Sequence, residues 1–496
     1  MSQHHDEATS RIFALDQTQR QRPLPGKMEE GQKKVQQKSV KAGDGGAMSE
    51  GARLDIPFLQ GIWESIVAKD QQCLTHFERS EAKQDLMGDN VLAASAPRTL
   101  TEVALNALNK VLDRRLQQQS QVSILQVAAA KSPMYNDRDF RIMFARAERM
   151  NPTKAADRLT AYLSYAIELF GQEALIEPVQ TTVFTPIDEQ VLRAGWIQLL
   201  LTRDHIGRRI LVMEDLGPGD FSPPNKMRVA FFLLQAAAKD DDSQKMGIQV
   251  VLQVFDPVNS SLLNRPSIRE QFRRLFACSP VRFSAIHICV GEGMCSGTEA
   301  DETEVAASTS SRNRDEEIIS CVESLLGVDE RIRTTFHSGS IIECHSRLSF
   351  FGINPDTIPM TSTGRVKLKD HEKWIMIQVG RDRAYQQGRT FPIVECPTNK
   401  QILLVKGRHV ARHEGNMRLR SLLQERYDER NIATRAQKIS ITSEVLETLQ
   451  DEGYTFLVKN NADFWVMPDR KTVLEKLAIA FRTVPRLKPL SNAKTS

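Results

Sequence analysis

Residues 196–214 read WIQLLLTRDHIGRRILVME and predict a β-hairpin. Two apolar runs, residues 196–201 and 209–214, have the length and composition of buried strands. Between them, Gly207 provides the freedom at positive φ that a tight turn requires. This hairpin begins a segment in which strands and helices alternate.

Downstream of the hairpin, apolar strands and amphipathic helices follow one another to Gly352. Residues 291–314 are rich in Ser, Thr and Glu without periodicity, which predicts an irregular insertion. Because the strand runs are continuously apolar, we expect a largely parallel sheet covered on both faces. We predict strands at residues 247–255, 283–290 and 332–336, and helices at residues 227–238, 268–276, 316–326 and 341–351.

Helical patterns precede the hairpin and predict a helical bracket over residues 99–175. One helix follows Thr99, a second spans residues 137–150, and a third spans residues 154–170 and stops at Gly171. The α/β lobe is then expected at residues 176–365.

Three polar segments are predicted to lie outside these domains. Residues 1–98 and 487–496 have the composition of disordered tails. An apolar island at residues 56–63 docks somewhere, forms a partner-binding element, or is a collapsed patch without a role. Residues 366–400 are predicted to be a linker, to which residues 374–379 contribute a strand.

Length and composition indicate an intracellular, soluble protein with two domains and flexible segments. The chain has 496 residues and a formal net charge of +4, which is too small to attract nucleic acid or membrane as a whole. Its seven cysteines are scattered, with no CxxC pair and no zinc-site spacing, as in a reducing compartment. The first ten residues lack the apolar region of a secretory signal. The longest apolar stretch, residues 229–238, is half of the roughly 20 residues that span a bilayer. Cytoplasmic and nuclear locations both remain open.

Four motifs in the centre of the chain resemble the CRAL-TRIO lipid-binding domains. They are FRIMFARA at residues 140–147 with NPTKAADRL at 151–159, RDHIGRRILV at 203–212, SPVRFSAIHI at 279–288, and the segment from Arg331 to Pro359. The resemblance implies a helical bracket and an α/β lobe whose sheet is the floor of an apolar cavity. It also implies binding of a lipid or other hydrophobic molecule without catalysis or cofactor.

The strands and one helix of the lobe supply the candidate pocket. One departure from the family concerns the gate helix, which normally follows the strand ending at Val290 and is replaced here by the insertion. The alternative is a lobe whose cavity is filled by side chains and which serves as a scaffold. The predicted pocket residues are Val229, Phe232, Leu233, Val251, Leu252, Val254, Phe283, Ile286 and Ile288.

Residues 401–486 predict a small basic α+β domain. Helices are expected at residues 417–428, 442–451 and 471–481, with a hairpin formed by residues 454–458 and 464–467. The motifs ILLVKGR at 402–408, RHEGN at 412–416 and RLR at 418–420 resemble a domain family of unknown function. The glycine-rich start of that family's motif is altered here, since Val405 and Lys406 replace its usual Gly and Arg.

The basic residues of this domain are candidates for holding phosphate groups of nucleic acid or of an anionic lipid. A solvated charged surface without a ligand is the alternative. His409 and His413 lack a third ligand, so no metal site is predicted. The candidates are Lys406, Arg408, Arg412, His413, Asn416, Arg418 and Arg420.

We therefore expect a protein that binds and does not catalyse, because no nucleophile, phosphate-loop or metalloprotease motif occurs. Its central lobe is expected to hold a hydrophobic small molecule, with the basic domain binding an anion or a partner. The alternative is a nucleic-acid-associated regulatory adaptor in which the lobe is only a scaffold. The oligomeric state stays open.

Overall fold

The computed structural model describes residues 56–88, 98–118, 124–214, 221–255, 265–291 and 304–483. The chain divides into Met1–Asp55, which lies outside the described residues, and Ile56–Ser496. The predicted tail at residues 487–496 and Cys295 also lie outside them.

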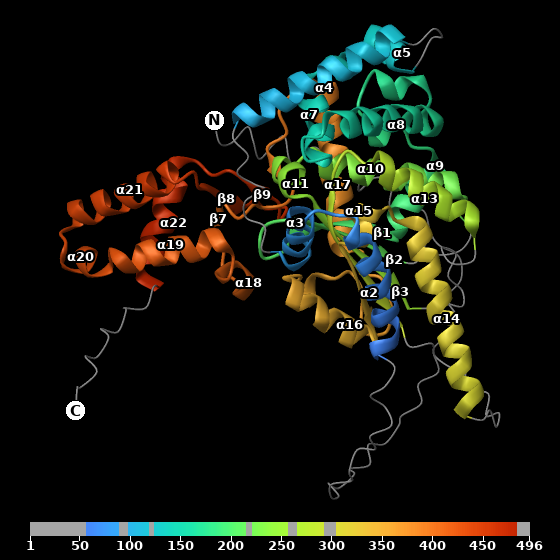
Figure 1. Ribbon diagram of the computed structural model, residues 1–496. Helices are drawn as coiled ribbons and strands as arrows, with labels where there is room; N and C mark the ends of the chain where they lie inside the picture. The colour runs from blue at the N-terminus through green and yellow to red at the C-terminus, as the bar shows by residue number, and fades with distance from the viewer. Residues whose placement is uncertain are drawn as a thin grey trace, which may run out of the picture. The chain divides into compact units, whose positions relative to one another are not determined.

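A five-stranded mixed sheet forms the centre of the lobe (Figure 1). The predicted hairpin is confirmed, since β1 and β2 are antiparallel and Gly207 between them has a φ of 101°. From β2 onward every neighbouring pair is parallel. In order across the sheet the strands are β1 (Ile197–Arg203), β2 (Arg209–Glu214), β3 (Ile248–Val254), β4 (Phe283–Val290) and β5 (Thr334–Ser338).

Both faces of the sheet are covered, as the continuous apolar runs predict. Helices α10 (Pro223–Ala238), α13 (Pro266–Cys278) and α14 (Glu304–Leu325) pack on one face. The opposite face packs against α16 (Ile341–Leu348) and the short turns that follow it. Alternate residues of β1 to β4 therefore enter two separate apolar cores. The remaining helices of the lobe are α11 (Asp241–Met246), α15 (Val328–Arg331), η5 (Ser349–Phe351) and η6 (Pro355–Thr357).

The expected irregular insertion at residues 291–314 is wrong over its second half, because α14 already begins at Glu304. Its buried residues Ile318, Val322 and Leu325 recur three or four positions apart and attach the helix to the core. Residues 292–303 lie outside the described residues.

Helices occur where the sequence predicts them before the hairpin, and we refer to them as the bracket helices. Asp137 caps α7 and Asn151 caps α8 with side-chain oxygens that accept backbone N–H groups. Helix α8 then ends at Gly171 and packs against α4, α7 and α13. The described helices between residue 98 and the hairpin are α4 (Arg98–Gln118), α5 (Ile124–Lys131), α6 (Pro133–Asn136), α7 (Arg138–Ala147), α8 (Pro152–Phe170), η3 (Gln172–Leu175), η4 (Thr181–Val183) and α9 (Pro186–Ala194).

The expected disordered tail at residues 1–98 is wrong over residues 56–88, which form α2 (Ile56–Gln72) and α3 (His76–Met87). The apolar island docks: Trp63 is 1% exposed, and its ring lies edge-on to Phe336 of β5. Its indole N–H donates to the Thr334 carbonyl at 3.0 Å. Burial of a few large apolar residues thus offsets the conformational entropy that is lost when a mostly polar segment becomes ordered.

The expected linker at residues 366–400 and the strand within it are also wrong. Residues Lys369–Gln386 form helix α17, which packs against β1. The run that favours a strand by composition contains Trp374, Ile375 and Ile377, which all reach the core from the helix. Tertiary burial therefore outweighs local β-propensity here.

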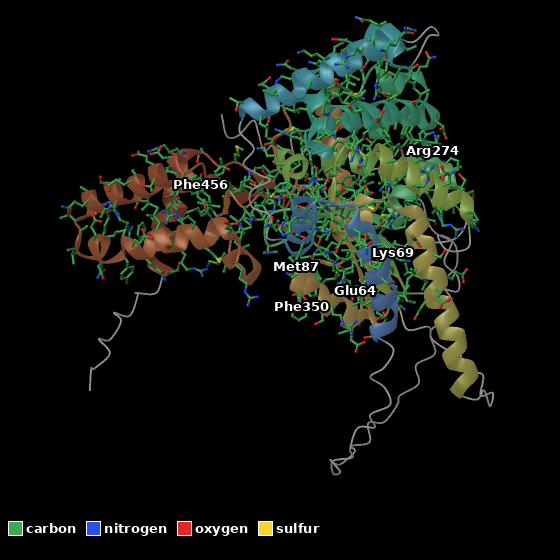
Figure 2. The ribbon with its side chains drawn as sticks, viewed as in Figure 1. Glu64, Lys69, Met87, Arg274, Phe350 and Phe456 are labelled. Atoms are coloured by element: carbon green, nitrogen blue, oxygen red, sulfur yellow. The ribbon has the colours of Figure 1, made fainter. Side chains whose placement is uncertain are left out.

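The small C-terminal α+β domain is confirmed and has a core of its own. Its sheet has the order β6-β9-β8-β7, in which β8 and β9 are the predicted hairpin and β7 is parallel to β8. Phe456, labelled in Figure 2, lies in this core. The elements are β6 (Ile393–Val394), β7 (Gln401–Leu403), α18 (Arg408–Ala411), α19 (Glu414–Glu425), α20 (Tyr427–Ile432), α21 (Arg435–Asp451), β8 (Thr455–Lys459), β9 (Trp465–Val466) and α22 (Arg470–Thr483).

Candidate functional site

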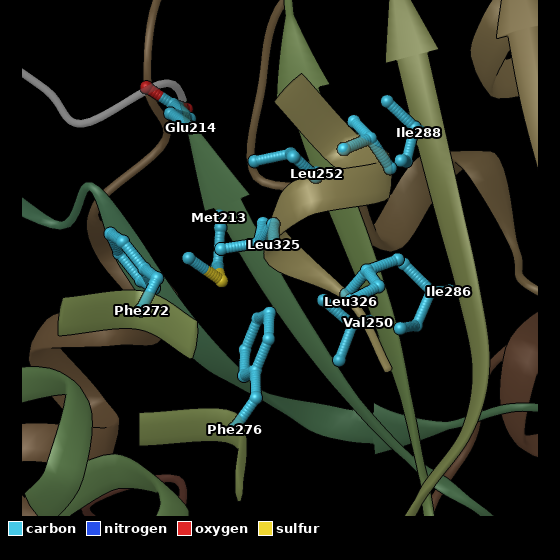
Figure 3. A pocket seen from close by; sticks show the side chains of 11 residues that line it. Met213, Glu214, Val250, Leu252, Phe272, Phe276, Ile286, Ile288, Leu325 and Leu326 are labelled. Atoms are coloured by element: carbon cyan, nitrogen blue, oxygen red, sulfur yellow. The ribbon is translucent and has the colours of Figure 1, made fainter. Parts of the chain in front are cut away.

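The first candidate site is the space between the sheet and helices α13 and α14 (Figure 3). Phe272 and Phe276 approach it from α13, and Leu325 comes from α14. Met213 and Val250 form part of the floor. This is where the resemblance to lipid-binding domains implies a cavity.

Side chains nearly fill this space. Gaps between atoms add up to about 430 Å³, but the centre of a water molecule can occupy only about 20 Å³ of it. The smaller volume decides what fits, because it excludes narrow gaps between packed atoms. It corresponds to about one or two water molecules. Within the described residues, the space between the sheet and helices α13 and α14 therefore has no room for a lipid tail.

The structure brings three of the nine predicted pocket residues, Leu252, Ile286 and Ile288, to this space. Val251 faces the core on the opposite side of the sheet, as strand alternation requires. The other five are packed inside the main core: Val229, Phe232, Leu233, Val254 and Phe283.

Among the described residues that line this space, Glu214, the last residue of β2, is the one that is ionisable. Its Oε1 atom is buried and accepts no hydrogen bond within the described part of the chain. Burial raises the pKa of the Glu214 carboxyl to about 8. A carboxyl group in such surroundings is held mainly in its neutral form near neutral pH.

The second candidate site is a cleft between the bracket and helices α10 and α11. Its free volume is about 840 Å³, which lies within the range of small-molecule sites. Phe140, Ile142 and Tyr162 form an apolar wall and belong to the buried side of the bracket helices. The Tyr162 hydroxyl donates to Gln235 Oε1 at 3.1 Å, which fixes the ring in place. The cleft is thus present without a ligand, and one of its walls is apolar.

Most charged groups around the cleft neutralise one another. Arg138 pairs with Glu102 and with Asp139. Asp241 accepts from Arg146 at 2.8 Å and from Lys245 at 2.5 Å. These pairs leave little net charge for a ligand.

Two charged residues that line the cleft form no ion pair within the described residues: Asp137, whose carboxylate caps α7, and the cation Lys239. Lys239 is exposed to solvent as a residue. Protein atoms around its ammonium group nevertheless lower the Lys239 pKa, because they remove part of its hydration. The Asp382 carboxylate acts in the opposite direction and raises this pKa. Exposure to water combined with partial desolvation is expected for a side chain on the wall of a cleft. Lys239 is a cation available to an anionic ligand.

Sequence reasoning does not identify this cleft. Its walls come from helices about 100 residues apart, around Phe140 and Lys239, and no motif joins them. One local signal exists, since Lys239 directly follows the long apolar run of α10.

In the C-terminal domain, two residues of the RHEGN motif support the fold. Asn416 Oδ1 accepts from the Leu403 N–H at 2.7 Å, and its Nδ2 donates to the Leu403 carbonyl at 2.8 Å. Asn416 therefore continues the hydrogen bonding of strand β7. A Cβ on Gly415 would lie 2.5 Å from the Gln401 carbonyl oxygen, so the helix approaches the strand only with glycine there.

The remaining anion candidates divide into occupied and available cations. Arg418 pairs with Glu452 and with Glu425. Arg420 donates to the Ala411 carbonyl at 3.0 Å but stays exposed. Lys406 and Arg412 are exposed and form no ion pair within the described residues.

Two candidates need separate mention. His413 is partly buried, and burial lowers the pKa of its imidazole, so it stays neutral near pH 7 and adds no charge. The side chain of Arg408 lies outside the described residues.

Within the described residues, no group of three or more His, Cys, Asp or Glu side chains is arranged to hold a metal ion. In the same part of the chain, no helix has the length and apolar character needed to cross a membrane.

Comparison with known families gives one match. Residues 401–483 match the family described as "Domain of unknown function (DUF6824)". The match covers the small α+β domain and does not include the central lobe. No curated protein matches the chain.

Proposed function

We propose that the central domain binds an amphipathic molecule, with an apolar body and an anionic group, without chemical conversion. The bound molecule occupies the cleft between the bracket and helices α10 and α11. The observation that carries this proposal is Lys239, a cation that forms no ion pair within the described residues, beside an apolar wall in a cleft of about 840 Å³.

The order of elements supports a relationship to the CRAL-TRIO domains, namely bracket helices, an antiparallel hairpin and successive parallel strands. In that family the ligand lies over the sheet. Here that space has room for about one or two water molecules, so the cleft is the better location for a ligand. We therefore propose the type of ligand that the CRAL-TRIO domains bind, but in the cleft and not over the sheet.

Binding is tested with oleate as an anionic probe and oleyl alcohol as its neutral counterpart. Lys239→Met keeps the apolar stem and removes the charge, so it is expected to weaken oleate binding by about 10-fold. Oleyl alcohol is expected to bind both proteins alike. The measurement is titration of the full chain, purified without detergent, followed by native mass spectrometry.

Lys245→Met is the matched control, because the Lys245 ammonium is already paired with Asp241 at 2.5 Å. Its oleate affinity is expected to equal that of the wild type. Equal losses in the two variants, or no binding of either probe, would remove the proposal.

A second function is favoured by the unpaired cations of the C-terminal domain. We propose as an alternative that Lys406, Arg408 and Arg412 contact the phosphates of nucleic acid, so that the chain acts as a regulatory adaptor. Support comes from the exposure of Lys406 and Arg412, which are free of carboxylate partners among the described residues.

Salt dependence of DNA binding tests this alternative. Replacing Lys406 and Arg412 by Ala is expected to weaken binding and lower the slope of log K against log salt by about 2. Arg418→Ala is the control, since Glu452 and Glu425 already neutralise Arg418. An unchanged slope in the double variant argues against nucleic acid.

A further inference from the structure

Four arginine side chains gather at the amino ends of the parallel strands. Three of them directly precede a strand: Arg208 precedes β2, Arg282 precedes β4 and Arg333 precedes β5. They are 1%, 5% and 0% exposed. Arg149 joins them from the turn between α7 and α8. We call these four residues the arginine cluster. All four carry a positive charge, because guanidinium groups stay protonated in proteins.

A carboxylate from α3 lies at the centre of the arginine cluster. Asp85 Oδ2 is 2.6 Å from Arg282 Nη1 and 2.9 Å from Arg333 Nε, and the carboxylate is 3.5 Å from Arg149. Arg208 donates to the Asp85 backbone carbonyl. Although burial alone raises the pKa of Asp85, the nearby Arg282 and Arg333 hold it below its usual value. Asp85 is therefore bound as an anion.

One carboxylate does not satisfy the donors that surround it. Arg208 Nη2 and Arg333 Nη2 are buried without a hydrogen-bond acceptor in the described residues. Arg149 Nε and Nη2 lie 3.2 Å from Glu81 and 3.5 Å from Asp85, in ion pairs that lack hydrogen-bond geometry. Native structures seldom leave such groups unpaired. The arginine cluster has more donors than its present anion can use.

The backbone of Arg149 is strained in reaching the cluster. Arg149 has a φ of 49° and Met150 a φ of 65°, a left-handed conformation that is unfavourable for residues other than glycine. Strain of this kind persists where the surroundings fix it, commonly at ligand sites.

Helix α3 supplies half of the negative charge at the cluster. Asp85 and Glu81 belong to α3, whereas Asp204 and Asp329 belong to the lobe. Without α3, four guanidinium groups would face two carboxylates among the described residues. Two positive charges would then be unbalanced, which matches a phosphate dianion.

We propose that the arginine cluster is a binding site for a phosphate-bearing ligand, and that Asp85 occupies it as an internal substitute. A phosphate group offers the charge and the oxygen acceptors that the carboxylate lacks. Binding displaces α3 from the amino end of the sheet. Because α3 belongs to the same chain, Asp85 is present at the site at an effective concentration on the order of millimolar. The phosphate-bearing ligand must compete with Asp85 at this concentration.

The site is tested by emptying it. Asp85→Ala and the isosteric Asp85→Asn are compared with wild type by thermal unfolding in 10 mM phosphate and in chloride of equal ionic strength. Phosphate is expected to raise the Tm of both variants by about 2–4 °C more than that of the wild type.

Asp70→Ala is the matched control. It breaks the pair of Asp70 with Arg331 at 2.7 Å and loosens the same N-terminal segment, but it leaves the arginine cluster occupied. Its Tm is expected to respond to phosphate as the wild type does. Equal phosphate responses in all four proteins overturn the assignment of the site.

Competition with α3 is tested in the wild type by hydrogen exchange of residues 76–88. Faster exchange with inorganic tripolyphosphate assigns a soluble phosphate ligand. Faster exchange only with vesicles that contain phosphatidylinositol bisphosphate assigns a lipid headgroup. Unchanged exchange with both overturns the displacement of α3. Neither result depends on the cleft beside Lys239, so this inference and the proposed function fail separately.

Discussion

Glu395 illustrates how one buried carboxylate organises its surroundings. Its Oε1 accepts from Arg209 at 2.7 Å and from the Trp374 indole at 2.9 Å. Its Oε2 accepts from Gln378 at 2.8 Å and Arg381 at 2.9 Å. Burial raises the pKa of Glu395, but the charges of Arg209 and Arg381 outweigh burial and lower it to about 2.

Replacement of Glu395 by Gln is expected to lower the free energy of unfolding by about 3–5 kcal/mol, because buried Arg209 loses its counter-charge. In the wild type this contribution is complete above the unfolded pKa near 4.5 and is lost as pH falls toward 2. Urea unfolding between pH 7 and 3 measures both effects. A variant that matches the wild type at pH 7 would contradict this account.

Glu214 has the opposite pH dependence. Its pKa is raised to about 8 in the folded state, so the folded protein holds the proton more tightly than the unfolded chain. Stability is therefore expected to fall as pH rises from about 4.5 to 8. Glu214→Gln removes this loss and is expected to gain on the order of 2 kcal/mol over the wild type at pH 8, with little difference at pH 4.

Urea unfolding at both pH values measures the gain. The exposed Glu317→Gln variant, at a residue on α14, is the control and is expected to show no such pH dependence. A Glu214→Gln variant whose advantage does not grow with pH would count against a desolvated carboxyl.

Among the elements, the contact of α19 with β7 depends on a glycine. Gly415→Ala places a methyl group 2.5 Å from the Gln401 carbonyl oxygen, a backbone atom that cannot rotate away. We expect a loss of about 1–3 kcal/mol. Gly61→Ala in α2, where nothing lies within 4 Å, is expected to be neutral or slightly stabilising. Chemical unfolding of both variants checks the contrast.

The elements differ in how far the sequence predicts them. Strands β3 and β4 follow from unbroken apolar runs, and α8 follows from its cap Asn151 and its stop Gly171. Helix α17 does not, because its buried Trp374 and Ile377 also suit a strand. The helix is favoured by packing on β1, which local sequence does not encode.

The same limit applies to the candidate sites. The sequence identifies the sheet residues Leu252 and Ile286 beside the expected cavity, but the packing that closes it comes from α14. Lys239 and Asp85 gain their roles from partners far along the chain, such as Arg282 for Asp85. Sequence spacing alone does not show which charges remain unpaired.

At the scale of the whole molecule, the C-terminal domain has an apolar core separate from those of the lobe. We expect two unfolding units. Leu163→Ala and Leu477→Ala, both at fully buried positions, are each expected to cost about 2–5 kcal/mol in their own unit.

Hydrogen exchange in increasing urea, followed by peptide, measures the two units independently. Leu477→Ala is expected to shift peptides of residues 401–483 and to leave those of α8 unchanged. Joint shifts of both sets in either variant would show a single cooperative unit instead.

The insertion of Asp85 among arginines has a practical consequence for protein production. A truncated chain beginning at the bracket helix α4 loses Asp85 and Glu81 along with the Trp63 anchor. Such a fragment would present bare guanidinium groups next to an uncovered apolar surface. It would bind cellular polyanions and aggregate during purification. Any DNA affinity measured on this fragment would result from the truncation and would not be a property of the native protein.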